Sequence, residues 1–265
     1  MKKSAVLGIL LLSSTLLGAE LPSPEPESLV GLGYVFPSTA NAPGANGAYF
    51  KTRMVLTNPH TTRILLAAVL DTQTGSAGIK TIILEVGETR VYENFLQDVF
   101  AYTGGGGVGL MEVTETRPFY ASAEVWAENA NGRFSTSLFG MGIADRVVNL
   151  ANKDTGYSLA AGVRVNASNR ANVGCVNMYY AAAQVRADVY NESSATVPAA
   201  QLVLDLPGSG WAQTSVPVTG ENIRIFFWQL TAAENPHGTY CYAVNVNNQS
   251  NDGTSIPAAR IDRIR

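Results

Sequence analysis

Three glycines in the stretch YTGGGGVGL (102–110) have the spacing of a nucleotide-binding loop. Gly104, Gly106 and Gly109 match G-x-G-x-x-G, and the acidic residue Glu124 follows at about the expected 20-residue distance. A dinucleotide loop must follow a strand and open a helix, whereas here a helical segment precedes the glycines and a strand follows them. We therefore interpret the glycines as a flexible connection, expect no nucleotide to bind, and expect Ser at positions 104–107 to leave folding nearly intact.

The histidines and serines show no pattern typical of a hydrolase. His60 and His237 each follow an Asn-Pro pair in a turn, and their spacing is not that of a metal site. Ser209 lies between glycines but not in a G-x-S-x-G elbow. A hydrolase would need one of these histidines, with carboxylates, in a cleft between the two repeats described below, and this stays an alternative hypothesis.

Acidic residues offer two further possibilities. Glu112, Glu115, Glu124 and Glu128 lie on one predicted hairpin, where two carboxylates could work as a pair on a sugar, although solvent-facing strand positions explain them equally well. Asp252 in NQSNDGT (248–254) lacks the neighbouring acidic residues of a Ca²⁺ loop, so a turn is the better interpretation. The sequence predicts no metal and no cofactor.

Aromatic side chains could form a flat platform for stacking a sugar or a peptide. We expect core packing for the tryptophans. Tyr179 and Tyr180 occupy the loop that corresponds to Pro59 and His60 in the first repeat, so we expect them at the surface, as a possible contact to a partner. The five candidates are Tyr179, Tyr180, Trp126, Trp211 and Trp228.

The N-terminal segment has the three parts of an export signal: Lys2 and Lys3, an apolar run over 6–17, and small residues before Glu20. The run is too short for a membrane-spanning helix, so we predict a signal peptide (1–19) cleaved near Ala19 and a Pro/Glu-rich leader (20–31). The chain is then exported, to the periplasm or the extracellular space, with no membrane span in its mature part.

Composition narrows the partners. Charged residues make up 15 % of the chain and the net charge is −3, so there is no basic surface for nucleic acid. Cys175 and Cys241 are the two cysteines. In an exported protein an even number favours a disulfide, with two free thiols as the alternative.

The chain repeats itself at an offset close to 120 residues. The matching segments are FKTRMVLTN (50–58) with NRANVGCVN (169–177), ILLAAVLDTQTG (64–75) with AQVRADVYNESS (183–194), TIILEVGETRVY (81–92) with AQLVLDLPGSGW (200–211), and FYASAEVWAENANG (119–132) with TYCYAVNVNNQSNDG (239–253). This alignment places Cys175 on Leu56 and Cys241 on Ala121.

Apolar residues alternate within most of these segments, which is typical of β-strands. We predict an all-β chain of two tandem antiparallel β-sandwiches, immunoglobulin-like or jelly-roll-like, over 32–145 and 146–265. Phe95, Leu96, Val99 and Phe100 instead have helical spacing, and 220–232 is similarly apolar, so each sandwich is expected to contain a short helical crossover.

The segment YVFPSTANAPGANGAYFKTRMVLTNP (34–59) resembles a repeat module of many secreted bacterial proteins. The shared positions are Phe36-Pro37, Pro43-Gly44, Gly47, Phe50, Thr52 and Asn58-Pro59. The second copy departs from this pattern, because Asn177 is followed by Met178 and the glycine run is missing. The resemblance implies a non-catalytic β-sandwich without catalytic residues to carry over.

The leading hypothesis is an exported, non-catalytic structural or adhesion-type protein that presents loops to a cell-surface or extracellular protein or glycan. A carbohydrate-binding module and a hydrolase with an inter-domain site are the alternatives.

Overall fold

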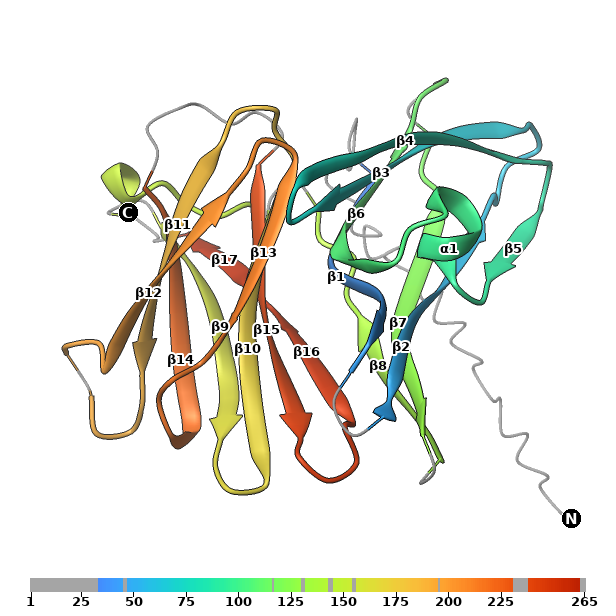
Figure 1. The fold of residues 1–265 in the computed structure, drawn as a ribbon. Coiled ribbons are helices and arrows are strands. Elements are labelled where there is room, and N and C mark those ends of the chain that lie inside the picture. Colours follow the sequence, from blue (N-terminus) through green and yellow to red (C-terminus); the bar gives the residue numbers. More distant parts are fainter. Residues whose placement is uncertain are drawn as a thin grey trace, which may run out of the picture.

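A computed structural model describes residues 33–44, 47–115, 117–129, 132–142, 145–153, 156–194, 196–230 and 238–262 (Figure 1). The predicted signal peptide and leader lie outside the described residues. The first half, as we call it, contains β1 (Tyr34–Pro43), β2 (Tyr49–Thr57), β3 (Ile64–Thr72), β4 (Gly75–Leu84), β5 (Thr89–Tyr92), helix α1 (Phe95–Phe100), β6 (Gly104–Glu112), β7 (Tyr120–Asn129) and β8 (Gly132–Leu138).

The second half follows a 3₁₀ turn, η3 (Leu150–Asn152). It contains β9 (Gly156–Val165), β10 (Asn169–Asn177), β11 (Ala183–Tyr190), β12 (Ala200–Leu206), β13 (Gly210–Ser215), β14 (Gly220–Gln229), β15 (Thr239–Asn247), β16 (Gly253–Pro257) and β17 (Ala259–Asp262). The protein is therefore all-β, as predicted. In β2, for example, Thr52, Met54 and Leu56 are buried and their neighbours are partly exposed, which is the period of a half-buried strand.

Two sheets connect these strands. The larger sheet is mixed and runs β16-β15-β10-β13-β3-β6-β1-β2-β7-β8, with β4 paired to β3 and β5 to β2. The smaller sheet runs β12-β11-β14-β9-β17. A single parallel residue pair, Gly210 with Thr72, carries the larger sheet from one half into the other.

The strand pairings of the first half recur in the second. β2 pairs with β5 and β7 as β10 pairs with β13 and β15, and β3 pairs with β4 and β6 as β11 pairs with β12 and β14. Leu56 lies opposite Ala121, and Cys175 lies opposite Cys241. The segments that match in sequence thus occupy matching places in the pairing.

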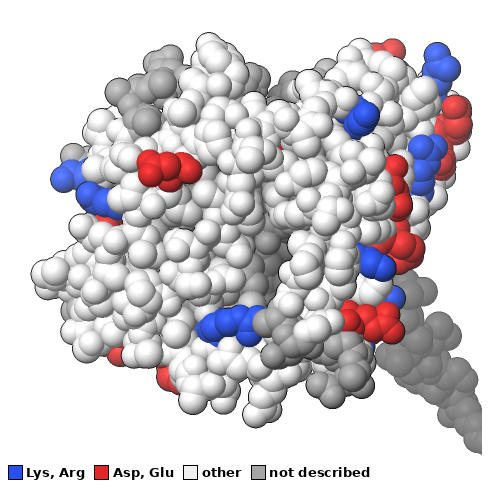
Figure 2. Space-filling model, in the orientation of Figure 1, with Lys and Arg blue, Asp and Glu red and all other residues white. Residues whose placement is uncertain are grey.

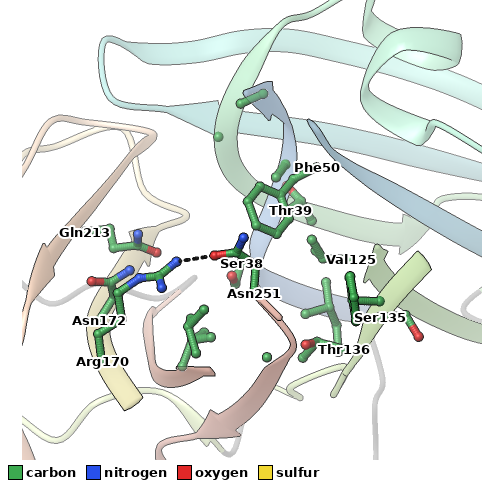
Figure 3. A pocket seen from close by; sticks show the side chains of 18 of the residues that line it. Ser38, Thr39, Phe50, Val125, Ser135, Thr136, Arg170, Asn172, Gln213 and Asn251 are labelled. Atoms are coloured by element: carbon green, nitrogen blue, oxygen red, sulfur yellow. Dashed lines mark hydrogen bonds between the residues drawn. The ribbon is translucent and has the colours of Figure 1, made fainter. Parts of the chain in front are cut away.

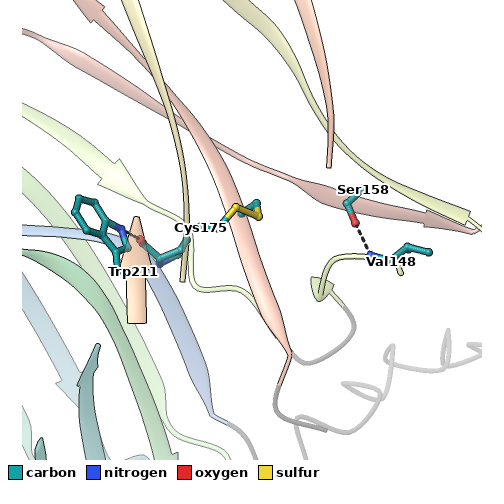
Figure 4. The surroundings of a disulfide bond; sticks show 6 residues. Val148, Ser158, Cys175 and Trp211 are labelled. Atoms are coloured by element: carbon teal, nitrogen blue, oxygen red, sulfur yellow. Dashed lines mark hydrogen bonds between the residues drawn. A yellow bond between two sulfur atoms is a disulfide. The ribbon is translucent and has the colours of Figure 1, made fainter. Parts of the chain in front are cut away.

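The disulfide joins Cys175 to Cys241 across neighbouring strands, as the even cysteine count predicted. Both cysteines are buried in the core of the second half. Trp211 lies on the other side of the same sheet, toward the first half (Figure 4). The sheet β13-β10-β15 therefore has one face in its own core and the other against the first half.

Three clusters of buried apolar residues follow from this arrangement. One fills the first half, with Phe36, Leu66 and Phe95 among its members, and one fills the second half around the disulfide. The third joins the two halves and consists of Val35, Met141, Val176, Trp211 and Tyr240, with Met178 packed against it. This third cluster explains why β15 buries both faces: Cys241 points into the core and Tyr240 toward the first half.

Only the first of the two expected helical crossovers forms. Helix α1 spans Phe95–Phe100 and ends at Ala101, whose φ of 53° is left-handed. Its counterpart at 220–232 is strand β14 over Gly220–Gln229, so the second helical prediction is wrong. Ile223, Ile225 and Phe227 are buried at a period of two, which is the pattern of a strand.

The prediction that the glycine run is a flexible connection is also wrong. The glycines begin β6, which pairs with β1 on one side and β3 on the other. Gly105, Gly107 and Gly109 face the second half, and we call them the glycine face. A Cβ on these three residues would meet Trp211, Val176 and Met178, respectively. The absence of side chains lets the second half pack directly on the backbone of the first.

Candidate functional site

A buried asparagine organises the same loop in each half. In the first half the Asn58 side-chain amide donates hydrogen bonds to the carbonyl oxygens of Thr62 (2.8 Å), Leu84 (3.2 Å) and Glu85 (2.9 Å). Its Oδ1 accepts a hydrogen bond from the backbone N–H of His60 at 2.9 Å. Asn58 thereby holds the β2–β3 loop against the end of β4.

Asn177 repeats this arrangement in the second half. Its amide donates to the carbonyl oxygens of Ala181 (2.8 Å) and Pro207 (3.0 Å), and its Oδ1 accepts from the N–H of Tyr179 (3.3 Å). The carbonyl of Tyr179 in turn accepts from the N–H of Ser209 at 2.6 Å. The backbone that carries the two tyrosines is thus fixed on both sides.

The tyrosine pair, Tyr179 and Tyr180, lies at the surface as predicted. Tyr180 is 78 % exposed. The two ring centroids are 4.2 Å apart, the ring planes are inclined at 42°, and the Tyr179 hydroxyl donates to the Tyr180 hydroxyl at 2.9 Å. This hydrogen bond raises the pKa of Tyr179. The two rings are tilted and do not form a flat surface.

The tryptophans do not join the tyrosine pair. Trp211 is buried between the halves, where its indole N–H donates to the carbonyl of Pro37 at 2.9 Å. Trp126 lies on β7, and Cζ of the Arg133 guanidinium is 4.0 Å from the centroid of the Trp126 ring. Trp228 lies half-buried on β14. The five aromatic residues therefore form no common platform, and the core packing expected for the tryptophans is found for Trp126 and Trp211.

A cavity of about 300 Å³ lies between the two halves, and Trp211 is one of its lining residues (Figure 3). β1, β7 and β8 of the first half form one wall, and β10, β13 and β15 form the other. Arg170 is its one charged lining residue in the described part of the chain. The surface around the hollow between the two lobes is mostly uncharged (Figure 2).

The catalytic candidates do not meet in this cavity. Its described lining contains neither a histidine nor a carboxylate. His60 lies elsewhere, with its Nε2 2.6 Å from the carbonyl oxygen of Pro118, and His237 lies outside the described residues. Ser209 lies in the turn between β12 and β13 and contacts the tyrosine loop through its backbone.

The acidic candidates have structural partners. The buried carboxylate of Glu112 accepts hydrogen bonds from the backbone N–H groups of Thr114 (2.8 Å) and Glu115 (2.9 Å), and Glu115 pairs with Arg117. Glu124 forms ion pairs with Arg53 at 4.0 Å and Arg133 at 3.7 Å. Glu128 is exposed at the end of β7. None of these contacts creates a paired-carboxylate cleft.

The segment that contains Asp252 forms a turn, as expected. Asn247 accepts hydrogen bonds from the N–H groups of Gln249 and Ser250, and Asn251 has a φ of 62°. In the described part of the chain, no three His, Cys, Asp or Glu residues are grouped so that they could hold a metal ion. No described helix has the length and apolarity to cross a membrane.

Three residues with unusual surroundings were not singled out from the sequence: Asp71, Tyr240 and Arg170. Burial raises the pKa of Asp71 on β3 to about 7, and its Oδ1 has no hydrogen-bond partner. Burial likewise raises the pKa of Tyr240 to about 12. For Arg170 the sequence offered one indication of importance, because the aligned residue of the first repeat, Lys51, is also basic.

No family model matches the chain, and no curated protein matches it in sequence.

Proposed function

We propose that this chain is an exported, non-catalytic protein of adhesion type, built from two tandem β-sandwich units, that contacts an extracellular protein through Tyr179 and Tyr180. The observation that carries the proposal is the tyrosine pair itself. Tyr180 is 78 % exposed, yet its loop is fixed by hydrogen bonds from Asn177 and Ser209. Aromatic side chains of this kind are enriched in binding interfaces because they bury a large area at a small cost in side-chain entropy.

The remaining parts of the proposal rest on the sequence together with the pairing of the strands. The corresponding pairings in the two halves support two β-sandwich units of one type, in keeping with the resemblance to repeat modules of secreted bacterial proteins. The Cys175–Cys241 disulfide and the apolar N-terminal segment support export. The catalytic candidates that the structure describes, His60 and Ser209, do not line the cavity between the halves, which supports a non-catalytic role.

The geometry of the pair favours a protein partner over a polysaccharide. A planar run of sugar rings stacks best on coplanar aromatic rings, whereas the two tyrosine rings are inclined at 42°. A protein surface can instead receive Tyr180 in a pocket, as interface anchors commonly are. Glycan binding is one of the outcomes of the test below.

The test compares the wild-type exported chain with Tyr179→Ala/Tyr180→Ala and with Tyr120→Ala. Tyr120 is a matched control, because it is 66 % exposed on β7 of the first half. Each protein is applied to immobilised fibronectin, collagen and a glycan array. We expect binding to a protein surface that the double variant loses at least tenfold and that the control retains.

Three results would count against the proposal. Binding that both variants retain would remove the tyrosine pair from the interface, and binding to glycans alone would favour the carbohydrate-binding alternative. No binding to any of these surfaces would contradict the adhesion role. Circular dichroism of the double variant separates lost contact from lost fold.

A further inference from the structure

The cavity between the halves is mostly apolar, with serine and threonine residues on its first-half side and larger polar groups on its second-half side. Apolar side chains from both halves form most of it, namely Phe50, Val125, Phe134, Leu138, Trp211 and Val244. Amide and guanidinium groups of Asn172, Gln213 and Arg170 lie together on the second-half side (Figure 3). A ligand that fills this space would meet mainly apolar surface, and it would meet the one charged group of the described lining at the second-half side.

Arg170 has spare hydrogen-bonding capacity. Its Nη1 donates to Oδ1 of Asn248 at 3.2 Å and its Nη2 to Oδ1 of Asn251 at 3.1 Å. Both acceptors are uncharged, and a guanidinium has five N–H donors. Among the residues that the structure describes, no carboxylate lies within ion-pair distance of Arg170, whereas the nearby Arg164 pairs with Glu221 at 3.1 Å.

The ligand group that best matches a half-buried guanidinium beside apolar surface is a carboxylate. It neutralises the charge, and the guanidinium can bind it through two parallel hydrogen bonds. The size of the cavity limits the rest of the ligand. An engineered cavity of about 150 Å³ accepts benzene, so a space of about 300 Å³ accepts a single aromatic ring with a short chain. The volume is at the lower end of the range for small-molecule sites.

We propose that this cavity binds a small aryl-alkyl carboxylate, with its carboxylate on Arg170 and its aromatic ring against Trp211 and Phe50. The turn that holds Asn248 and Asn251 keeps the guanidinium at the cavity. The site uses residues of both halves, so binding also stabilises their contact. It is separate from the tyrosine pair.

The experiment uses 4-phenylbutyrate as the probe, with its neutral amide and acetate as matched comparisons. The indole N–H of Trp211 reports on the site, because Trp211 lines the cavity and the chain has three tryptophans whose NMR resonances are assignable by substitution. We expect phenylbutyrate to shift this resonance and raise the melting temperature. The amide should bind at least tenfold more weakly, and acetate should leave the resonance unmoved.

Variants then test the role of the guanidinium. Arg170→Gln should weaken phenylbutyrate binding at least tenfold, and Arg170→Lys should weaken it less. Arg164→Gln, on the exposed surface of β9, should leave it unchanged. Tyr179→Ala/Tyr180→Ala should also leave it unchanged, so that the failure of one proposal does not entail failure of the other.

Equal binding of phenylbutyrate and its amide would overturn the proposal, as would undiminished binding by Arg170→Gln. An unmoved Trp211 resonance at millimolar phenylbutyrate would do the same. The comparison of acid and amide needs no substitution, so it decides the question even if Arg170→Gln unfolds.

Discussion

Gly107→Ala is the sharpest perturbation of the contact between the halves. A Cβ at position 107 would lie 2.5 Å from Cγ2 and 2.7 Å from Cβ of Val176, whereas carbon atoms in contact are about 3.5–4.0 Å apart. Val176 is fully buried, and its Cβ cannot move away by a change of rotamer, so relief of the clash requires a shift of the backbone. The backbone of Gly107 is outside the left-handed region, and alanine therefore introduces no strain of its own.

Overpacking of a close-packed core costs about 1–3 kcal/mol. Replacing glycine by alanine in a strand stabilises the folded state by about 0.5–1 kcal/mol, because the unfolded chain loses conformational freedom. We therefore expect Gly107→Ala to lower the free energy of unfolding by about 1–2 kcal/mol. Urea denaturation followed by tryptophan fluorescence measures this, since Trp211 lies in the same contact.

Two further variants separate this clash from a general effect of alanine. Gly109→Ala lies on the same face of β6, but its added Cβ meets only the flexible end of Met178, so we expect a change within about 0.5 kcal/mol. In a Val176→Gly background, Gly107→Ala should be neutral or stabilising. Equal effects of the two alanines, or additive effects of the 107 and 176 substitutions, would refute the packing argument.

Three other predictions concern the same molecule. Replacing Cys175 and Cys241 with alanine should lower the free energy of unfolding by about 4 kcal/mol, because the bridge closes a loop of 66 residues; non-reducing mass spectrometry that found two free thiols would contradict it. The pKa of Asp71 is raised to about 7, so the folded state keeps a proton that the unfolded state loses above about pH 4. Wild-type stability should therefore fall by up to about 1.4 kcal/mol per pH unit between pH 4 and 7, and a pH-independent gap to Asp71→Asn in urea titrations would argue against this. Trp211→Phe should cost about 1–3 kcal/mol in thermal denaturation, because it leaves the buried carbonyl of Pro37 without its donor, and an unchanged melting temperature would show that this hydrogen bond contributes nothing.

Much of the fold could be predicted from local patterns. Alternation of apolar residues located the strands, and the spacing of Phe95, Leu96, Val99 and Phe100 located helix α1. The aligned repeat placed Cys175 and Cys241 on strands that turn out to be neighbours, as their counterparts Leu56 and Ala121 are. These features depend on each segment and its match in the other half.

The site was less predictable. Tyr179 and Tyr180 were found because their loop could be compared with the first repeat. Arg170 was missed, because its importance depends on a cavity that forms only when strands of both halves pack together. Likewise, nothing in the sequence around Asp71 distinguishes it from a solvent-facing strand end, although the folded chain buries it.

The sequence alone indicated an all-β chain and its internal repeat, favoured a disulfide between the two cysteines, and placed the tyrosine loop at the surface, because periodicity and composition can be read within single segments. Only the tertiary structure decided the meaning of the glycines at 104–109. They belong to a central strand, and they lack side chains at the positions where Val176 and Trp211 of the other half pack against it. The physical reason is that a glycine has no side chain whose type could indicate what packs against it. Which atoms pack there depends on how the two halves fit together.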